Sequence, residues 1–497
     1  MRATSYTTPA DLTGAPKCRW RNLYREVDLY KCALRLYTKP LFSWRKALLT
    51  STDNKDLYDF ARRGPQNLAA IHSALRKESF TFRPGVALHR NFRGKKRTLY
   101  IYPWEERLVD LLLYRLLSAR LHHRFSTSSY AYRLRGFGLD RCQHKIAALL
   151  ADTNAPLFVL KRDIANYFPS VDQTILLQQL QQIVEPDDYL FQLLRQRVRF
   201  QLEEGGATQT AFRGIAFGTP IACFFANLYL TPLDLQLDSI PSLRYFRYAD
   251  DLLFLSERRE AVEEARARFD ALLKERDLSS KTSHEQNLLL CKNAFQIAGF
   301  TTASRFRHLG LEFSAGGGIR LSRDKCRKIC NIFRYAFRRR RAKLARILDF
   351  RKRAQFAVEL ARRSLDDSVR NVAIIDYYLK HVTDESQLRL IDRWLAEEVL
   401  SIAFHGGHKK GYFRLLPYET LRLMGLPSLV HRRREIRHGQ IEAPFFVWKR
   451  YQKRKSSRET TARPLPLKAE PPAFSPCPEA VTAHSFSEDL VGEGRHL

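Results

Sequence analysis

The chain has 497 residues, of which 44% are hydrophobic, so it is long and apolar enough for about two to four domains with cores of their own. Its 85 Lys and Arg outnumber 52 Asp and Glu, and the net charge of +33 favours a polyanionic partner, with nucleic acid first and a membrane surface second. The 8 scattered cysteines exclude a secreted disulfide scaffold, and without a bilayer-spanning apolar run or a signal peptide we expect a cytoplasmic protein with no membrane partner.

Composition divides the chain into successive regions. Residues 1–60 are basic and aromatic, and they predict a helical N-terminal extension. Residues 61–155 contain a polar, glycine-containing turn, "NFRGKKRTLYIY", and then "WEERLVDLLLYRLLSARLHHRF", whose leucines recur at helical spacing. Residues 156–313 alternate short strands with helices, which is typical of an α+β fold.

The remainder of the chain reads as helical and then as unstructured. From 321 to about 450 the sequence is mostly helical and very basic. After Lys455 the composition changes, and six prolines fall between Pro464 and Pro478 among small and polar residues. We therefore expect residues 456–497 to be a disordered tail.

Two adjacent aspartates interrupt an apolar, aromatic run, "RYFRYADDLLFLS", over residues 244–256. The flanks of Asp250 and Asp251 predict two strands joined by a tight turn. A third carboxylate, Asp163, follows the short apolar strand 157–160. If these strands are neighbours in one sheet, Asp163 and Asp250 can converge.

Clustered carboxylates repel one another, so such a cluster normally implies a divalent cation. Hard oxygen ligands select Mg²⁺, with Mn²⁺ as the alternative, and two such ions are the usual apparatus of phosphoryl transfer. In a chain this basic, the reaction that these residues predict is nucleotidyl transfer on a nucleic acid.

The order of several motifs resembles that of reverse transcriptases. "YADD" at 248–251 is similar to their Y-x-D-D signature, and "DIANYF" at 163–168 resembles their first palm motif. The remaining matches are "RGIAFGTPIACFFANLYLTPLD", which resembles the glycine-rich motif of retron-like and diversity-generating enzymes, "LSSKT" for the next palm motif, "FRHLGLEF" for the primer-grip hairpin, and "GKKRTLYIY" and "SSYAYRLRGFG" for the fingers. The resemblance covers roughly residues 60–315.

The resemblance implies a right-hand polymerase in which residues 61–313 form the fingers and a palm with an antiparallel sheet. A helical thumb over 314–385 and a basic helical C-terminal region over 386–455 would follow. Within the C-terminal region, 421–450 resembles the corresponding part of the unknown-group, defence-associated reverse transcriptases of bacteria. One departure from the family is Ala216-Phe217 before Gly218, a position that in relatives lies beside the templating base.

The resemblance also implies roles for individual residues. Asp163 and Asp250 would ligate both metal ions together with the Ile164 carbonyl, while Asp251 shapes the hairpin and its charge. Lys281 would donate a proton to pyrophosphate. The residues implied for substrate binding are Lys95, Lys96 and Arg97 at the triphosphate, Phe168 as a gate against the ribose 2′-hydroxyl, and Gly214 and Gly218 at template and nucleotide.

Each of these roles has a plain structural alternative. The alternative is core packing for Phe168, a solvated surface for Lys281, and ordinary turns for the two glycines. At least one of the three basic residues at 95–97 is expected to face solvent.

Two basic segments predict contacts with nucleic acid. Aromatic residues interleave with arginines over 325–353, which favours the start of a thumb that lies along a phosphate backbone. There the candidates are Arg338, Arg339, Arg340 and Arg341. In "HRRR" at 431–434, Arg432 and Arg433 are candidates for a second RNA contact, with an inter-subunit salt-bridge surface as the alternative.

The leading hypothesis is an RNA-directed DNA polymerase, a nucleotidyltransferase of bacterial antiphage defence. The resemblance implies a dedicated, structured non-coding RNA as template, dNTPs as substrates, DNA as product and often a homo-oligomer. Two alternatives stand beside it. An RNA-dependent RNA polymerase with the same palm is opposed by Phe168, and a catalytically silent RNA-binding scaffold is opposed by the three aspartates.

Overall fold

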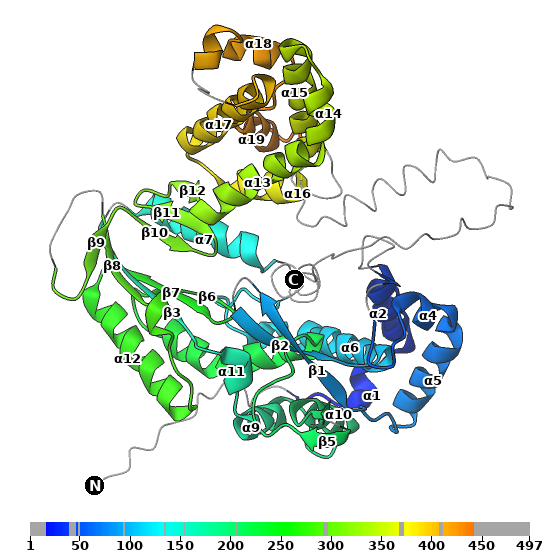
Figure 1. Ribbon diagram of the computed structural model, residues 1–497. Helices are drawn as coiled ribbons and strands as arrows, with labels where there is room; N and C mark the ends of the chain where they lie inside the picture. The colour runs from blue at the N-terminus through cyan, green and yellow to red at the C-terminus, as the bar shows by residue number, and fades with distance from the viewer. Residues whose placement is uncertain are drawn as a thin grey trace, which may run out of the picture.

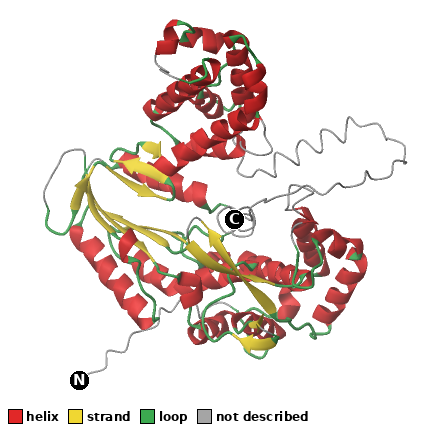
Figure 2. Ribbon diagram, in the orientation of Figure 1, coloured by secondary structure: helices red, strands yellow, loops and turns green. Residues whose placement is uncertain are grey.

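The computed structural model describes residues 16–38, 46–47, 50–92, 95–133, 136–153, 155–204, 206–291, 297–366, 372–406 and 411–441. Sheets at the centre are flanked by helices, and a group of helices stands apart from them at the C-terminal end of the described chain (Figures 1 and 2). The α+β class and the fingers, palm and thumb arrangement expected from the sequence are confirmed. Within the described residues, no helix combines the length and apolar character that a membrane crossing requires.

The palm is a five-stranded sheet in the order β6-β7-β3-β8-β9. Its strands are β3 (Leu157–Asp163), β6 (Arg244–Tyr248), β7 (Asp251–Ser256), β8 (Gln286–Leu290) and β9 (Thr301–Ala303). β3 pairs antiparallel with β7 and β8, whereas the edge strand β9 pairs parallel with β8. The predicted hairpin and its predicted neighbour strand are therefore confirmed.

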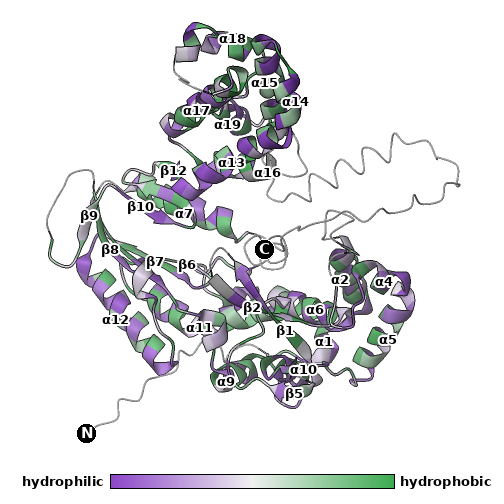
Figure 3. Cartoon of the chain, in the orientation of Figure 1, coloured by the Kyte–Doolittle hydropathy of each residue, from purple (hydrophilic) through white to green (hydrophobic). Residues whose placement is uncertain are grey.

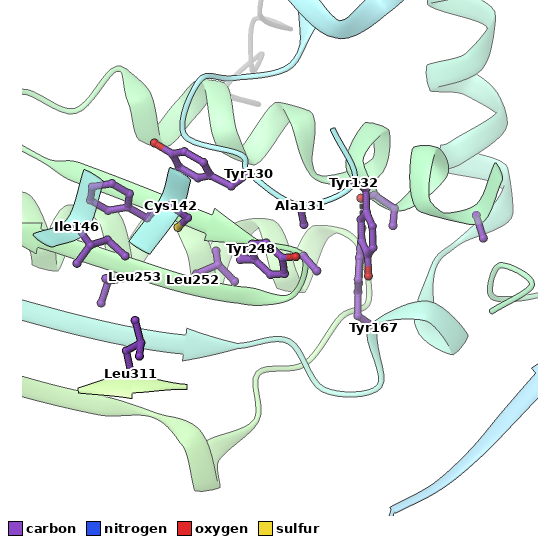
Figure 4. Packing of buried hydrophobic residues seen from close by; sticks show 14 of the residues in the cluster. Tyr130, Ala131, Tyr132, Cys142, Ile146, Tyr167, Tyr248, Leu252, Leu253 and Leu311 are labelled. Carbon is purple, nitrogen blue, oxygen red and sulfur yellow. Dashed lines mark hydrogen bonds between the residues drawn. The ribbon is translucent and has the colours of Figure 1, made fainter. Parts of the chain in front are cut away.

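Helices cover the palm sheet on both sides. α12 (Arg259–Glu275) packs against β3 and β7, and α7 (Leu139–Asp152) and α11 (Pro220–Asp238) pack against β6 (Figure 1). Because both faces are covered, residues 252–255 of β7 are all buried and read as a continuous apolar run. Figure 4 shows Cys142 and Ile146 of α7 beside Leu252 and Leu253.

The fingers are built around a second sheet and a buried helix. The sheet has the order β2-β1-β4-β5 and consists of β1 (Gly85–Phe92), β2 (Lys95–Ile101), β4 (Gln201–Glu204) and β5 (Ala207–Thr210). The predicted leucine-rich helix is α6 (Trp104–Leu121). It is buried on most of its surface rather than on one face, because α2 and α11 pack against it. The other helices before the palm are α1 (Trp20–Leu23), α2 (Glu26–Thr38), α4 (Leu57–Arg62), α5 (Gly64–Arg76) and η2 (His122–Arg124), followed after β3 by α8 (Tyr167–Ser170), α9 (Gln173–Ile183) and α10 (Tyr189–Val198).

A three-stranded sheet connects the palm to the C-terminal helices. It follows η3 (Thr282–His284) and β9, and it contains β10 (Arg305–His308), β11 (Leu311–Ser314) and β12 (Ile319–Leu321). The helices after it are α13 (Arg323–Arg339), α14 (Arg341–Arg346), α15 (Phe350–Asp366), α16 (Val372–His381), α17 (Glu385–Ala403), η4 (Gly411–Arg414), α18 (Tyr418–Leu423) and α19 (Leu429–Arg437). α17 packs on α13 and α15, and α19 packs on α16 and α17.

α13 shows why this basic segment folds as a helix. Ile329, Phe333 and Phe337 recur every four residues and are buried, while arginines occupy the opposite side. The two faces are visible as green and purple in Figure 3. The predicted disordered tail, 456–497, lies outside the described residues.

A buried ion pair lies beneath the β6–β7 hairpin. Arg247 of β6 donates from Nε and Nη2 to the two carboxylate oxygens of Asp234 on α11, at 2.7 and 2.5 Å. Both side chains are completely buried. The hydroxyl of Tyr245 also donates to Asp234, at 2.9 Å. Each polar group in this cluster is satisfied by another, which is the condition for burying charge at acceptable cost.

Asp234→Asn tests how strongly this pair stabilises the palm. The substitution leaves the Arg247 charge buried without its counterion, so we expect the local free energy of unfolding to fall by about 3–5 kcal/mol. Hydrogen exchange of the β6 and β7 amides in increasing urea measures the change. As a control, Glu263→Ala breaks a pair with Arg259 whose side chains are 51% and 41% exposed, and it should cost less than about 1 kcal/mol. Equal losses in the two variants would contradict the assignment.

Candidate active site

The three aspartates meet where two neighbouring strands begin and end. Asp163 is the last residue of β3, Asp251 is the first of β7, and the sheet register places them directly opposite each other. Asp250 lies in the turn between β6 and β7, and its carbonyl accepts the main-chain N–H of Ile164 at 3.1 Å. The structure thus brings together the carboxylates that the sequence predicted to converge.

The turn that carries Asp250 has strained backbone. Ala249 has a φ of 59°, in the left-handed region that costs a residue with a side chain about 1–2 kcal/mol. Arg247 holds the turn in place, since its Nη1 donates to the Ala249 carbonyl at 3.2 Å. The buried ion pair below the hairpin is therefore linked directly to the position of the carboxylates above it.

Burial and like charges act together on Asp250. Burial, the larger cause, and the charges of Asp163 and Asp251 raise the pKa of Asp250 to about 7, while Arg97 acts in the opposite direction. Two lysines offset part of the negative charge. Nζ of Lys281 lies 3.6 Å from Oδ2 of Asp163, and Nζ of Lys161 lies 3.8 Å from Oδ1 of Asp251.

The charges of Asp163 and Asp251 act on Asp250, and three such oxygen donors are a set suited to a hard divalent cation. Among the described residues, the three aspartates included, no group of three or more His, Cys, Asp or Glu has a preformed metal-binding arrangement. The fit to Mg²⁺ therefore rests on oxygen donors whose charge is incompletely neutralised. Asp163 and Asp250 are the residues that would hold the metal, with Asp251 beside them.

Lys281 reaches the site through the main chain as well as the side chain. Its N–H donates to the Asp163 carbonyl at 2.7 Å, and its side chain is 31% exposed. Lys281 is therefore a partly buried partner of Asp163 rather than a fully solvated lysine, and its role as a proton donor stays a prediction. Lys161 was not predicted, although it lies two residues before Asp163 on the same face of β3, where period-two spacing could have identified it.

Phe168 belongs to a row of aromatic rings. Its ring centroid lies 5.1 Å from that of Phe217 and 6.2 Å from that of Tyr132, both nearly perpendicular. The guanidinium carbon of Arg97 lies 5.6 Å from the Phe217 centroid, so the row reaches from the palm to β2. Phe168 is half-buried, which is compatible with both core packing and a role as the sugar gate.

Gly214 and Gly218 differ in the space that the structure leaves for a side chain. A Cβ on Gly214 would lie 2.9 Å from the carbonyl oxygen of Pro169 and 3.1 Å from that of Phe168, and its φ is +82°. Within the described structure, the close approach that Gly214 allows is to the chain beside Phe168. Its predicted approach to the template stays a prediction. Gly218 has a φ of +105° and leaves ordinary van der Waals space toward β2.

The predicted triphosphate contacts are described only in part. The Lys95 and Lys96 main chain lies in β2, but their side chains are outside the described residues. Arg97 is exposed, and its charge acts on Asp250. Its positive charge is thus close enough to the carboxylates to act on Asp250.

The two predicted basic contacts differ in the structure. Arg338 to Arg341 are all exposed at the α13–α14 junction. By contrast, Arg432 donates to both oxygens of buried Asp376 at 3.0 and 3.2 Å. Arg433 is buried, and it bonds to the Val382 carbonyl and, at 2.9 Å, to Glu385. The predicted RNA contact of Arg432 and Arg433 is therefore replaced by a role in packing α19 against α16 and α17.

Comparison with known proteins places a family over the region that carries this site. Residues 89–313 match the family described as Reverse transcriptase (RNA-dependent DNA polymerase). No curated protein matches the chain.

Solved structures with some likeness to the chain are yeast telomerases. The apo telomerase of Candida tropicalis truncated from its C-terminal domain has 10% identity and a TM-score of 0.37 over 52% of this chain, which spans 60% of that protein. The apo telomerase of C. tropicalis has 11% identity and a TM-score of 0.41 over 69% of this chain and 65% of its own. Telomerase of C. albicans in complex with a fragment of telomeric RNA has 10% identity and a TM-score of 0.41, over 74% and 71%.

These scores are too low to support a functional comparison, whereas the family match contains all three aspartates, the glycine-rich motif and Lys281. The matched region also contains the complete palm sheet on which the carboxylates converge. The chain therefore contains a reverse transcriptase domain over residues 89–313, the catalytic domain of RNA-directed DNA polymerases.

Proposed function

We propose that the whole protein is an RNA-directed DNA polymerase that copies a dedicated, structured non-coding RNA into DNA in bacterial antiphage defence. The observation that carries the polymerase activity is the cluster of Asp163, Asp250 and Asp251 in the palm sheet, where β3 ends and β7 begins. The defence role rests on the resemblance of residues 421–450, of which 442–450 lie outside the described residues. A cytoplasmic location and a homo-oligomeric assembly belong to the same proposal.

The cofactor that suits this site is Mg²⁺, with Mn²⁺ as the alternative. Asp163 and Asp250 would hold two ions, with the Ile164 carbonyl as a further ligand. When bound, the ions would lower the pKa of the primer 3′-hydroxyl and would neutralise charge on the triphosphate and pyrophosphate. Asp251, paired with Lys161, adjusts the charge of the site.

The reaction forms one bond and breaks another. The primer 3′-oxygen attacks the α-phosphorus of a dNTP, and the bond from that phosphorus to its bridging oxygen breaks to release pyrophosphate. Lys281 carries its ammonium beside Asp163, where it can give a proton to the departing pyrophosphate. Arg97 adds positive charge on the fingers side, facing the triphosphate.

The structure gives a reason to prefer an enzyme over a silent RNA-binding scaffold. The site holds three carboxylates close together above a strained Ala249, and both features cost free energy. An RNA-binding scaffold gains nothing from concentrated negative charge, since RNA is itself an anion. Strain and repulsion maintained at one point are typical of catalytic sites.

Asp250→Asn should reduce dNTP incorporation on an RNA template by at least about a thousandfold, because metal-ion charge stabilisation supplies several kcal/mol to phosphoryl transfer. The change removes one charge without removing volume, so we expect folding and RNA binding to stay near wild type. Primer extension measures incorporation, and filter binding measures RNA affinity. In bacterial cells, the variant should also lose protection against phage in plaque assays.

The matched control is Asp270→Asn, which removes an exposed carboxylate from α12 on the same palm. It should polymerise like the wild type. Near-wild-type incorporation by Asp250→Asn would refute the metal assignment. Phage protection that survives the loss of polymerisation would instead support the scaffold alternative.

Phe168→Ala should raise the ratio of rNTP to dNTP incorporation by about tenfold or more, because loss of the ring opens space beside the sugar 2′-carbon. Steady-state incorporation of matched rNTP and dNTP pairs gives the ratio. Phe212→Ala is the control, since Phe212 is 91% exposed and lies near the same glycine-rich motif. An unchanged ratio would assign Phe168 to core packing, and a wild type that already prefers rNTPs would identify an RNA polymerase.

Replacement of Arg338, Arg339, Arg340 and Arg341 with glutamine should weaken binding to unrelated RNAs by similar factors. Each lost phosphate contact lowers the log–log salt slope by about 0.7–0.9. Binding titrations over a range of salt measure the slope, and single-turnover incorporation at saturating template should change little. The control replaces the exposed Arg258, Arg266 and Lys274 at or along α12. An unchanged slope with a changed sedimentation coefficient would identify an oligomer contact instead.

A further inference from the structure

The start of α7 joins the palm to the C-terminal helices through one buried carboxylate. Oδ2 of Asp140 lies 2.9 Å from Nζ of Lys380, and Oδ1 lies 2.7 Å from Nε2 of His381. Both basic residues end α16. The side chains of Asp140 and His381 are only 12% and 8% exposed, so solvent screens this contact weakly.

The same face of α7 also holds the β10–β11 turn. One turn beyond Asp140, Nε2 of Gln143 donates to the Leu309 carbonyl at 2.9 Å. Leu309 has a φ of 49°, a left-handed conformation that is strained for leucine. Behind this turn, Nζ of Lys325 on α13 donates to the hydroxyl of Tyr378 on α16 at 2.8 Å. The hairpin, α13 and α16 therefore meet at one joint on α7.

α7 is in turn packed on the catalytic hairpin. Figure 4 shows Cys142 and Ile146 of α7 beside Tyr248 and Leu252, and it shows Leu311 of β11 in the same buried cluster. Burial raises the pKa of the Cys142 thiol well above its ordinary value, and the Asp251 charge adds to the effect. The charged end of the hairpin is thus close enough to act on α7 directly.

Tyr377 completes the connection from the thumb side. Burial raises the pKa of its hydroxyl well above the ordinary value, with further contributions from Asp140 and from Tyr248 of the catalytic hairpin. The side chain of Tyr377 on α16 is therefore close both to Asp140 of α7 and to Tyr248, the last residue of β6.

We propose that Asp140 is a positioning residue that fixes the root of the thumb to the catalytic hairpin and thereby sets how many nucleotides are added per template-binding event. This inference rests on the proposed polymerase function and adds a determinant of processivity to it. Asp140 touches no reacting atom in this role. It acts through α16 and the β10–β11 turn.

The energetics favour one strongly held arrangement. Hydrogen bonds and charges from His381 and Lys380 outweigh burial and lower the pKa of Asp140 to about 2, so the carboxylate is ionised at neutral pH. Asp140 also lies in the first turn of α7, where a negative charge is favourable. An exposed pair near the same joint, Arg307 of β10 with Asp324 of α13, has side chains 51% and 62% exposed and should contribute little.

The experiment compares Asp140→Asn, Asp140→Glu and the double variant Lys380→Gln/His381→Gln. A triple variant combines Asp140→Asn with the two glutamine substitutions. Asp324→Asn is the control, because it breaks the exposed pair between β10 and α13 near the same joint. Each full-length protein extends oligo(dT) on poly(rA) with dTTP and Mg²⁺, with heparin added as a trap. The measurements are run length per binding event, the single-turnover rate of the first addition, and hydrogen exchange in α16.

We expect Asp140→Asn and the double variant each to shorten the run at least about fivefold, with the rate of first addition unchanged. The triple variant should shorten the run no further than either of these two, because all three variants break the same contact between Asp140 and α16. Asp140→Glu should recover most of the run length, and exchange in α16 should rise wherever the run shortens. The double variant keeps the inference testable even if Asp140→Asn folds poorly.

Wild-type run lengths in both Asp140→Asn and the double variant would overturn the inference, as would a control that shortens the run equally. A first addition that slows in step with run length would also overturn it, since that would give Asp140 a part in the chemistry. A wild type that incorporates no dTTP would instead refute the proposed function. The two failures are therefore distinguishable.

Discussion

The position of the catalytic turn depends on Arg247. Its side chain is completely buried and reaches Asp234 and Asn227 of α11 and the Ala249 carbonyl. Its main chain accepts from the N–H of Tyr130 and donates to the Ser128 carbonyl. One residue thus ties the hairpin to the long helix behind the sheet and to the segment entering α7. Because a buried guanidinium must keep all of these partners, the turn above it has little freedom to move.

Interior arginines also change the meaning of the net charge. Arg162, Arg197 and Arg247 are among the largest fully buried side chains, and Arg197 is paired with buried Asp110 at 2.8 Å. These charges are neutralised inside the protein, so they offer nothing to a polyanion. The arginines at the α13–α14 junction, by contrast, are exposed, so their charge is available to a polyanion. A formal charge of +33 therefore overstates what reaches the surface, although its sign still favours a nucleic-acid partner.

Local pattern was enough to predict the α+β class and the convergence of the carboxylates, whereas the palm was implied by the resemblance to reverse transcriptases. The alternation of strands, the doublet Asp250-Asp251 and the strand before Asp163 all lie in short, contiguous stretches, and period-two geometry does the rest. Long-range pairing is not visible in such stretches. Arg432 and Arg433 appeared as an exposed basic run because their partners, Asp376 and Glu385, are 56 and 48 residues away. For the same reason Asp140 gave no signal, since its partners on α16 are 240 and 241 residues away. The predicted domain boundaries and the roles of individual site residues stay predictions.

The left-handed backbone at Ala249 limits how this sequence can vary. Glycine would remove the steric cost there, but it would also let the turn sample both hands and would lose more conformational entropy on folding. Larger side chains would pay the same backbone cost and would have to fit a position that is only 7% exposed. Alanine is the smallest residue that still restricts the backbone. At this position thermal stability and the ordering of the carboxylates favour different residues, so a variant library screened for stability alone would drift away from the sequence that keeps the site in order.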